Sequence, residues 1–580
     1  MYIRTKTTKN SLKKSVQVVE SVRQGDKVKQ RIVRHIGVAE DEHHLEELKK
    51  LAQVAMAEEM AQRQSLLDRD EYAKFLKGEF ERTCNGGERA FVSNLSYEEH
   101  VVEGFEEVYG KLFRDVGFAE VFGSSDRGRA NTKLLEQIVV ARIAIAQSKR
   151  GSVEWLSDRQ MSNVDLDRVY RMMDKLHERI GKAKAIALQK TLENLGGRVG
   201  VMLFDVTTLY FESFCEDDLR KRGFSKENKV REVQVVLAMA VSREGLPLSY
   251  ELFPGNTWEG RTLKETLRHF LKSFRPEDVI VVADAGMLSE ENLSYLEEEG
   301  YSYIVRSRTR SLTQRVKTCI RDMSGYEALG GSPDEDVIKC KVMDIERGRK
   351  LVAIHSEVKA KKDAYDREEL LFRLKEISSD CEGIASSKLV RDKGKRYLTR
   401  KGKDDATYVL DDAKVAEDAS WDGISGIVTN MEVTRGDIPE VLEYYKSLWK
   451  IEESFRVAKG PLRFRPIFHW KKERIESHIA ICYIAFTLQR HLEYRLKLCK
   501  GESYSLDKVR RVLSKVDSVI MKDSSTGTIY RFPRAMSPEA KKIYGAVGLK
   551  RDTKPTTITS IEKYRNRHSL GRINPWEWVL

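Results

Sequence analysis

Five short apolar runs between residues 199 and 305 limit the possible folds of this chain more than any other feature. The runs are Val201–Phe204, Val233–Val241, Leu248–Phe253, Val279–Ala283 and Tyr301–Val305. Runs of this length are typical of buried strands in α/β sheets. Helical patterns separate some of them, at Leu263–Phe274 and Ser289–Glu299, whereas the connection after Val241 is tight. We therefore predict an α/β fold whose sheet includes antiparallel strands.

Length and charge indicate several domains and a polyanionic partner. A chain of 580 residues is too long for one core, and two to four domains are expected. The net charge is +13 and the sequence pI about 9.1. Residues 1–36 contain ten Lys and Arg against two acids, and residues 541–580 contain nine against three. Basic ends of this kind suit contacts with a DNA backbone, although solubilising tails have the same composition.

Cysteine usage and the N-terminal sequence favour a cytoplasmic protein with no membrane partner. The seven Cys residues are scattered and never form C-x-x-C, which argues against a disulfide framework and a Cys zinc site. The sequence MYIRTKTTKN has no apolar signal region. No apolar run approaches the roughly 18 residues that span a bilayer.

Three acidic residues are candidates for a metal-dependent active site. Asp205 and Asp284 each follow an apolar strand, and carboxylates at strand ends converge at one rim of a sheet. Glu452 lies in Tyr445–Lys459, which we predict to be one helix because it lacks Pro and Gly. Tyr445 and Lys459 lie seven residues on either side of Glu452, on nearly the same face. Hard oxygen ligands from three elements are what two Mg²⁺ ions need for phosphoryl transfer. A strand-terminal Asp is more often a turn residue, so the prediction depends on the combination.

Several segments resemble the DDE transposases of bacterial insertion sequences, in the group with a Tyr-x2-Arg-x3-Glu-x6-Lys signature (insertion-sequence family four and its relatives). Tyr445, Glu452 and Lys459 match three of the four signature positions. The other similar segments are FDVTTLYFES (204–213), LPLSYELFPGNT (246–257), VVADAGMLSEENL (281–293), DGISGIVTN (422–430) and VRQGDKVKQRIVRHIG (22–37). The resemblance implies an RNase H-like core with a β insertion between the second Asp and the Glu. It also implies Asp205, Asp284 and Glu452 as catalytic metal ligands, Mg²⁺ as the cofactor with Mn²⁺ able to replace it, and Tyr445 and Lys459 as phosphate contacts.

One signature position departs from the family pattern. Leu448 stands where the signature has Arg, and a Leu side chain cannot bind a phosphate. Arg456, one turn after Glu452, is a candidate to supply the contact instead. Trp421 is a candidate to stack on a DNA base displaced at the cleavage site, with core packing as the favoured alternative.

These patterns divide the chain into seven regions. They are a basic β-hairpin arm (1–38), a helical linker (39–89), a helical domain that is a candidate for DNA binding (90–198), two parts of an RNase H-like core (199–306 and 437–498) around a β-rich insertion (307–436), and a basic C-terminal region (499–580).

The function expected from the resemblance is cut-and-paste transposition. The enzyme would bind the terminal inverted repeats of its insertion sequence, cleave double-stranded DNA and join the freed 3′-hydroxyl to target DNA. Two ends in one synapse need two protomers, so a homodimer on DNA is expected. Two alternatives remain open, namely an RNase H-like nuclease that does not join strands and a catalytically decayed DNA-binding protein. The site of action would be the bacterial nucleoid.

Overall fold

The structure is a computed structural model of the chain. It describes residues 1–7, 13–24, 27–56 (without 40, 43, 47, 50 and 54), 92–160, 164–211, 215–223, 232–257, 259–270, 275–287, 289–329, 337–378, 384–385, 396–401, 407–559 and 561. The contacts divide the chain into two compact units. The first contains residues 1–101, 517–535 and 552–565, and the second contains nearly all of the rest. Most of the predicted linker, from residue 57 to residue 89, lies outside the described residues.

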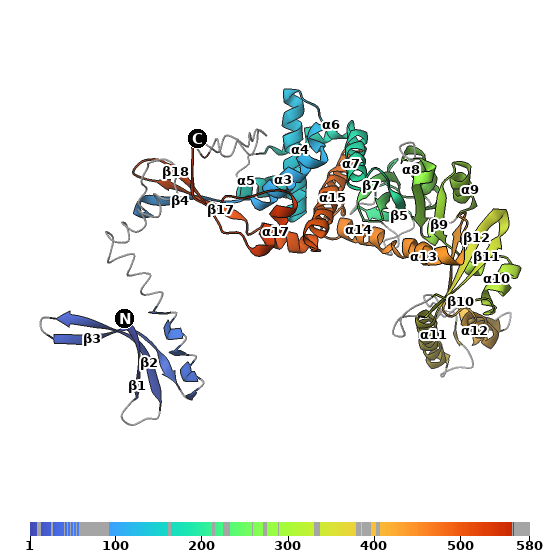
Figure 1. Cartoon of the computed structure of the whole chain (residues 1–580), viewed down its shortest axis with the longest axis horizontal. Coiled ribbons are helices and arrows are strands. Elements are labelled where there is room, and N and C mark those ends of the chain that lie inside the picture. The colour runs from blue at the N-terminus through green and yellow to red at the C-terminus, as the bar shows by residue number, and fades with distance from the viewer. Residues whose placement is uncertain are drawn as a thin grey trace. The chain divides into compact units, whose positions relative to one another are not determined.

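An antiparallel sheet forms the N-terminal part of the first unit (Figure 1). Its strands are β1 (Tyr2–Thr7), β2 (Lys14–Gln24) and β3 (Lys27–Ala39), in the order β1-β2-β3. The sequence predicts a two-stranded hairpin here, but β1 adds a third strand through its pairing with β2. Val16 and Val18 of β2 are buried against Leu45, Leu48 and Ala52, which follow in helical turns.

A second sheet of the first unit joins segments from opposite ends of the sequence. Its strands are β4 (Leu95–Val102), β17 (Asp517–Asp523), β18 (Ile529–Pro533) and β19 (Thr556–Ile558), in the order β19-β18-β17-β4. The sequence predicts a helical domain over residues 90–198, and β4 corrects this prediction for its first residues. Its partner β17 is more than 400 residues away, and a local sequence pattern cannot reveal a partner at that distance.

A mixed sheet of nine strands is the centre of the second unit and confirms the predicted α/β class (Figure 1). The order is β10-β11-β12-β16-β9-β8-β5-β6-β7, with parallel pairing only for β5–β8 and β8–β9. The strands are β5 (Gly200–Tyr210), β6 (Gln234–Ser242), β7 (Pro247–Pro254), β8 (Val279–Ala283), β9 (Ser302–Arg306), β10 (Glu327–Ala328), β11 (Ile338–Ile345), β12 (Arg349–Ser356) and β16 (Ile424–Thr429).

Helices cover both faces of this sheet. Alternate residues of a strand point to opposite faces. Val201 and Leu203 of β5 accordingly pack in one apolar cluster, and Met202 and Phe204 pack in another. The first cluster includes residues of α13 (Ile438–Lys446), α14 (Trp449–Lys459) and α15 (Lys472–Lys500), and the second includes residues of α8 (Glu259–Phe270) and α9 (Glu290–Glu298). Position 205 therefore shares a face with Val201 and Leu203, on the side of α14.

Helices from distant parts of the sequence surround α15, which is buried along most of its length. They are α3 (Gly104–Val116), α4 (Asp126–Ile145), α5 (Lys149–Gln160), α6 (Leu166–His177), α7 (Ile180–Asn194), α16 (Leu506–Leu513) and α17 (Pro538–Ala546). Within the described residues, none of the helices combines the length and the apolar character needed to cross a bilayer.

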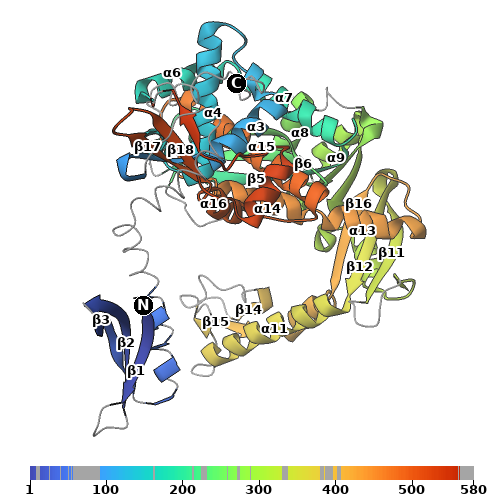
Figure 2. The same cartoon turned by 60° about the vertical axis from the view of Figure 1, so that its left-hand side comes forward.

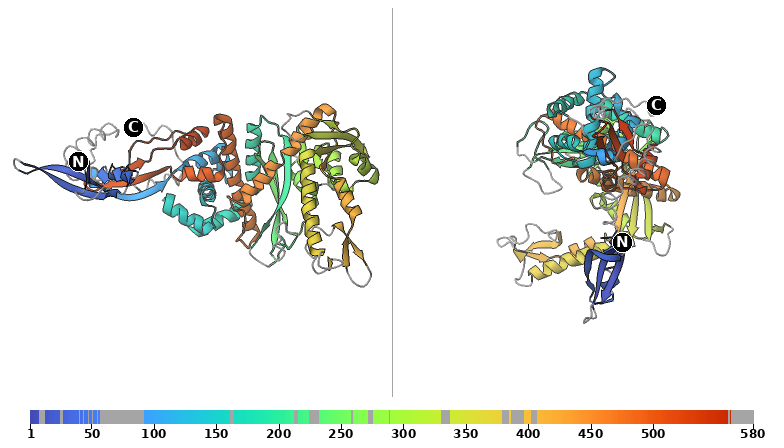
Figure 3. Two further views of the ribbon diagram at one scale, coloured as in Figure 1. Left: turned by 90° about the horizontal axis from the view of Figure 1, so that it is seen from below. Right: turned by 90° about the vertical axis from the view of Figure 1, so that its left-hand side faces the viewer.

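The insertion between β9 and α13 contains strands, as the sequence suggests, but most of them join the central sheet instead of forming a separate one. Strands β10, β11, β12 and β16 extend the central sheet, because β16 pairs with β9. A long helix, α11 (Glu357–Ser378), leads away from this sheet, and it is the yellow helix in Figures 2 and 3. The insertion also contains α10 (Gln314–Arg321), α12 (Asp412–Ala419) and a small sheet of β13 (Ile384–Ala385), β15 (Thr407–Leu410) and β14 (Leu398–Lys401).

Candidate active site

The parallel pairing of β5 and β8 sets two of the three candidate carboxylates side by side. The pairing ends at Phe204 and Ala283, so the next residues, Asp205 and Asp284, are neighbours at the point where the two strands part. Asp284 follows the last residue of β8, as predicted. Asp205 does not end its strand, because β5 continues to Tyr210 in pairing with β6. The end of β8, rather than the end of β5, exposes this position.

The third carboxylate lies in the first turn of α14. The sequence predicts one helix from Tyr445 to Lys459, but the structure contains two, α13 and α14, with Ser447 and Leu448 between them. The Ser447 hydroxyl donates to the Glu443 carbonyl at 2.8 Å, a back-bond that often bends a helix. Ile451 and Phe455 of α14 are buried in the apolar cluster that includes residues of β5. This packing fixes α14 on the face of the sheet that carries Asp205.

The three carboxylates line one pocket of about 230 Å³. The pocket combines acidic, basic, aromatic and apolar side chains from two strands and two helices. Its lining residues are Asp205, Asp284, Arg306, Tyr445, Lys446, Leu448, Ile451 and Glu452.

Two pocket residues, Arg306 and Tyr445, lie close to the charges of the carboxylates. Arg306, at the end of β9, lies with a guanidinium nitrogen 3.9 Å from a carboxylate oxygen of Asp284, and both side chains are about half exposed. Burial raises the pKa of the Tyr445 phenol, and the charges of Asp284 and Glu452 add to the rise while Arg306 opposes it. The phenol therefore keeps its proton at neutral pH and is a hydrogen-bond donor.

The donor chemistry of the pocket fits a hard divalent cation. Carboxylate oxygens are the ligands that Mg²⁺ prefers in proteins, and Asp205, Asp284 and Glu452 supply them from three elements. Among the described residues, no three His, Cys, Asp or Glu side chains are already grouped closely enough to hold an ion. The three carboxylates nevertheless line the same pocket.

The remaining candidate residues lie elsewhere. Lys459 ends α14, partly buried, and Arg456 is exposed on the same helix, but neither is among the described residues that line the pocket. Trp421 is only 5% exposed and packs in the apolar cluster that contains Met202 and Phe204. The guanidinium groups of Arg310 and Arg321 lie 5.8 and 5.5 Å from its ring centroid. This burial supports core packing, the favoured alternative for Trp421, over base stacking.

Sequence reasoning missed two basic residues of the pocket, Arg306 and Lys446. Arg306 directly follows the apolar run Tyr301–Val305. The rule that drew attention to Asp284, a polar residue at the end of an apolar strand, would have found Arg306 as well. Lys446 had no comparable signal, because it enters the pocket through the bend between α13 and α14.

Comparison with known proteins supplies the family. The model of the transposase DDE domain matches residues 200–488, and that of the IS1634 family transposase N-terminal domain matches residues 3–65. No curated protein matches the chain. Among solved structures, the cryo-EM piggyBac transposase synaptic complex with hairpin DNA is similar at 10% identity and a TM-score of 0.35, over 80% of this chain and 82% of that chain.

The Mos1 transposase paired-end complex with the left transposon end is similar at 14% identity and a TM-score of 0.14, over 27% of this chain and 53% of that chain. Both TM-scores lie below 0.5, so the assignment comes from the two family models. Their matches fall on the N-terminal sheet and on the segment that contains all three pocket carboxylates, and together they cover more than half of the chain. The chain belongs to the DDE transposases of insertion sequences.

Proposed function

We propose that this transposase binds the terminal inverted repeats of its own insertion sequence, cleaves the DNA at the element boundary and joins the freed 3′-hydroxyl to target DNA. The observation that supports this most directly is the meeting of Asp205, Asp284 and Glu452 on one pocket. A cut-and-paste enzyme of this kind acts on double-stranded DNA in the bacterial cytoplasm, at the nucleoid.

We further infer that β7-β6-β5-β8-β9 is an RNase H-like core. Its first three strands are antiparallel, its last two run parallel to β5, and the strand that carries the first acid lies at the centre. In this arrangement the insertion strands β16, β12, β11 and β10 are an addition to the edge at β9.

Asp205, Asp284 and Glu452 would hold two divalent ions, Mg²⁺ or Mn²⁺, in this core. Bound there, the ions would lower the pKa of the attacking water or 3′-hydroxyl and neutralise charge on the leaving oxygen. The backbone of Asp205 is held by its pairing with Met239 of β6. Asp284 directly follows β8, and Glu452 lies in the first turn of α14.

Arg306 and Lys446 would provide the positive charge that Leu448 cannot. Both line the pocket, whereas Arg456, the candidate from sequence, is exposed on α14 outside the set of lining residues. A guanidinium binds phosphate oxygens in bidentate fashion, which suits a strand held in line for attack. The protonated Tyr445 phenol would donate a further hydrogen bond to the same phosphate.

Cleavage of labelled DNA that carries the element's own end tests this function. The reactions contain Mg²⁺ or Ca²⁺ and the wild-type protein, Glu452→Gln or the matched control Glu453→Gln. Glu453 is the neighbouring carboxylate, 3.6 Å from Arg490, and is not among the residues that line the pocket. We expect a Mg²⁺-dependent nick at the boundary for the wild type and the control, and a loss of at least about 10³-fold for Glu452→Gln with DNA binding retained.

Joining separates transposition from the alternatives. A precleaved end with a free 3′-hydroxyl should be transferred into plasmid DNA under the same conditions. Nicking without transfer would identify a nuclease. Binding without nicking in either metal would identify a DNA-binding protein that has lost its chemistry, with Leu448 as the first position to restore to Arg.

A further inference from the structure

Helix α11 carries an exposed apolar stripe. Val358, Tyr365 and Phe372 are 60%, 62% and 63% exposed, although each is a large apolar or aromatic residue. They are seven residues apart, so in an α-helix they lie within about 20° of one line along the surface. Large apolar residues that recur in this way on a solvent-facing helix mark an interaction surface more often than single exposed residues do.

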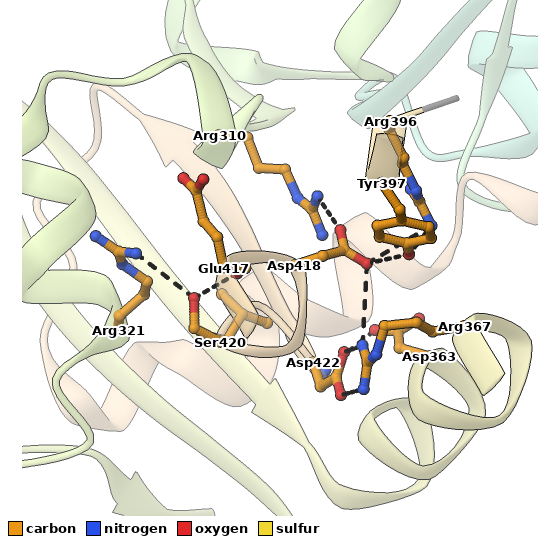
Figure 4. Close-up of polar contacts among 12 residues, drawn as sticks. Arg310, Arg321, Asp363, Arg367, Arg396, Tyr397, Glu417, Asp418, Ser420 and Asp422 are labelled. Atoms are coloured by element: carbon orange, nitrogen blue, oxygen red, sulfur yellow. Dashed lines mark hydrogen bonds and ion pairs between the residues drawn. The ribbon is translucent and has the colours of Figure 1, made fainter. Parts of the chain in front are cut away.

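The opposite face of α11 fixes the helix within the insertion. Arg367 is buried, and its guanidinium binds both carboxylate oxygens of Asp422 at 2.5 and 2.6 Å (Figure 4). Leu374, about two turns further along this inner face, packs with Tyr397 and Leu398. The inner face is therefore already occupied, and the stripe is held pointing away from it.

The charges that flank Tyr365 are separated along the helix. Lys361 and Lys362 lie on the N-terminal side of Tyr365, and Glu368 and Glu369 lie on its C-terminal side. All four are exposed. Each pair is three or four residues from Tyr365, so the pairs flank the stripe symmetrically.

We propose that the α11 stripe binds the same stripe of a second copy of this chain, with the two helices antiparallel and Tyr365 at the two-fold axis. This inference rests on the proposed function, since joining two ends of an element requires two protomers in one complex. A two-fold axis pairs a surface with itself, so the surface must be self-complementary.

The sequence of the stripe meets that requirement in only one orientation. When the helices are antiparallel, Val358 lies against Phe372 of the second copy. Lys361 and Lys362 then lie opposite Glu368 and Glu369 of that copy, which gives four oppositely charged pairs per dimer. Parallel pairing in register would place Lys against Lys and Glu against Glu, which is unfavourable.

The size of the surface indicates a dimer of modest affinity. A helix of 22 residues is about 33 Å long, and three large side chains per copy bury less area than a standard stable interface of about 1,600 Å². The two copies become effectively concentrated when each has bound one end of the same DNA molecule. The stripe would therefore contribute most at the stage when the ends are paired.

A charge exchange tests the orientation directly. Variant one is Lys361→Glu/Lys362→Glu, which makes all four charges that flank Tyr365 acidic. Variant two is Glu368→Lys/Glu369→Lys, which makes all four basic. In sedimentation experiments without DNA, we expect each variant alone to dimerise at least about tenfold more weakly than the wild type. An equimolar mixture of the two should recover the dimer, because every pair across the axis is again of opposite charge.

The control is Lys515→Glu/Lys541→Glu, which makes the same change of net charge as variant one, at exposed positions outside α11. It should dimerise as the wild type does. The proposal would be overturned if both variants dimerised as tightly as the wild type, or if the mixture stayed monomeric. It would also be overturned if the wild type were monomeric both free in solution and on paired ends. Nicking of a single end reports the proposed function separately, and we expect both charge variants to retain it.

Discussion

Replacement of Arg306 by Gln should have opposite effects on metal binding and on catalysis. The Arg306 guanidinium lies 3.9 Å from the Asp284 carboxylate, where it competes with a cation for that carboxylate. Both side chains are about half exposed, so the dielectric constant of water applies, and Coulomb's law gives about 1 kcal/mol for this separation. That energy corresponds to about a fivefold change in an equilibrium constant. We expect Arg306→Gln to bind Mn²⁺ about fivefold more tightly than the wild type.

The same variant should cleave DNA more slowly. Loss of a charge-assisted contact to the phosphate costs about 2 kcal/mol, or roughly thirtyfold in the rate of nicking at saturating metal. Calorimetric titration with Mn²⁺ in the absence of DNA measures the first effect, and single-turnover nicking measures the second.

Arg308→Gln is the matched control, because Arg308 is exposed nearby but donates to the Ala285 carbonyl at 3.1 Å. It should leave both quantities within about twofold of the wild type. Unchanged or weaker Mn²⁺ binding in Arg306→Gln would refute the competition between Arg306 and the cation. Unchanged nicking would refute the phosphate contact.

Three further outcomes follow from the structure. Arg367→Ala leaves the Asp422 carboxylate without its bidentate partner and should destabilise the docking of α11 by about 3 kcal/mol. The measurement is hydrogen exchange, which should become faster in this helix with little change at α15. Burial lowers the pKa of Lys149 to about 7, below its value in the unfolded chain. Between pH 7 and 9 the unfolded chain therefore keeps the Lys149 proton that the folded chain releases. The free energy of unfolding should therefore rise by about 2 kcal/mol over that range, and denaturant titrations should show the rise reduced in Lys149→Met. Tyr445→Phe should weaken binding to end DNA about tenfold, equally at pH 7 and 9, because the raised pKa keeps the phenol protonated at both; a loss only at pH 7 would contradict this.

The strands that carry the site could be predicted from sequence because they are buried on both faces. Val279–Ala283 is so uniformly apolar that its limits coincide with those of β8. The apolar run before Asp205 was predicted equally well, but its continuation to Tyr210 was not. The residues after Asp205, Val-Thr-Thr-Leu-Tyr, continue neither the apolar run nor a strict alternation, and their pairing with β6 shows that they are extended. Strand β4 and the extension of the sheet by the insertion were missed for the same reason, since both depend on partners far away in the sequence.

The acids of the site were predictable, whereas their surroundings were not. Asp205, Asp284 and Glu452 were chosen from position and resemblance, and the structure brings all three to one pocket. The helix that carries Glu452 looks continuous in sequence, because one Ser back-bond is enough to bend it and leaves no compositional trace. That bend brings Lys446 into the pocket, whereas Arg306 enters it from the end of β9. Helical spacing alone therefore indicates Arg456 as the basic neighbour of Glu452. Arg306 lies about 150 residues earlier, so the spacing of the helix carries no information about it.

The contact between the insertion and the pocket has a mechanical consequence. Strand β16 pairs with β9 through Thr429 with Ile304, Val428 with Val305 and Ile427 with Arg306. Beyond these pairs the Ser307 N–H donates to the Gly426 carbonyl at 2.8 Å, and at the other end the Asn430 side chain bonds the backbone of Tyr303. The insertion strands of the central sheet, β10, β11, β12 and β16, adjoin the catalytic strands through this pairing of β16 with β9. Arg306 takes part in this pairing and also lines the pocket. A shift of the insertion strands would therefore move the arginine that lies beside Asp284, so the position of the insertion and the charge in the pocket are coupled.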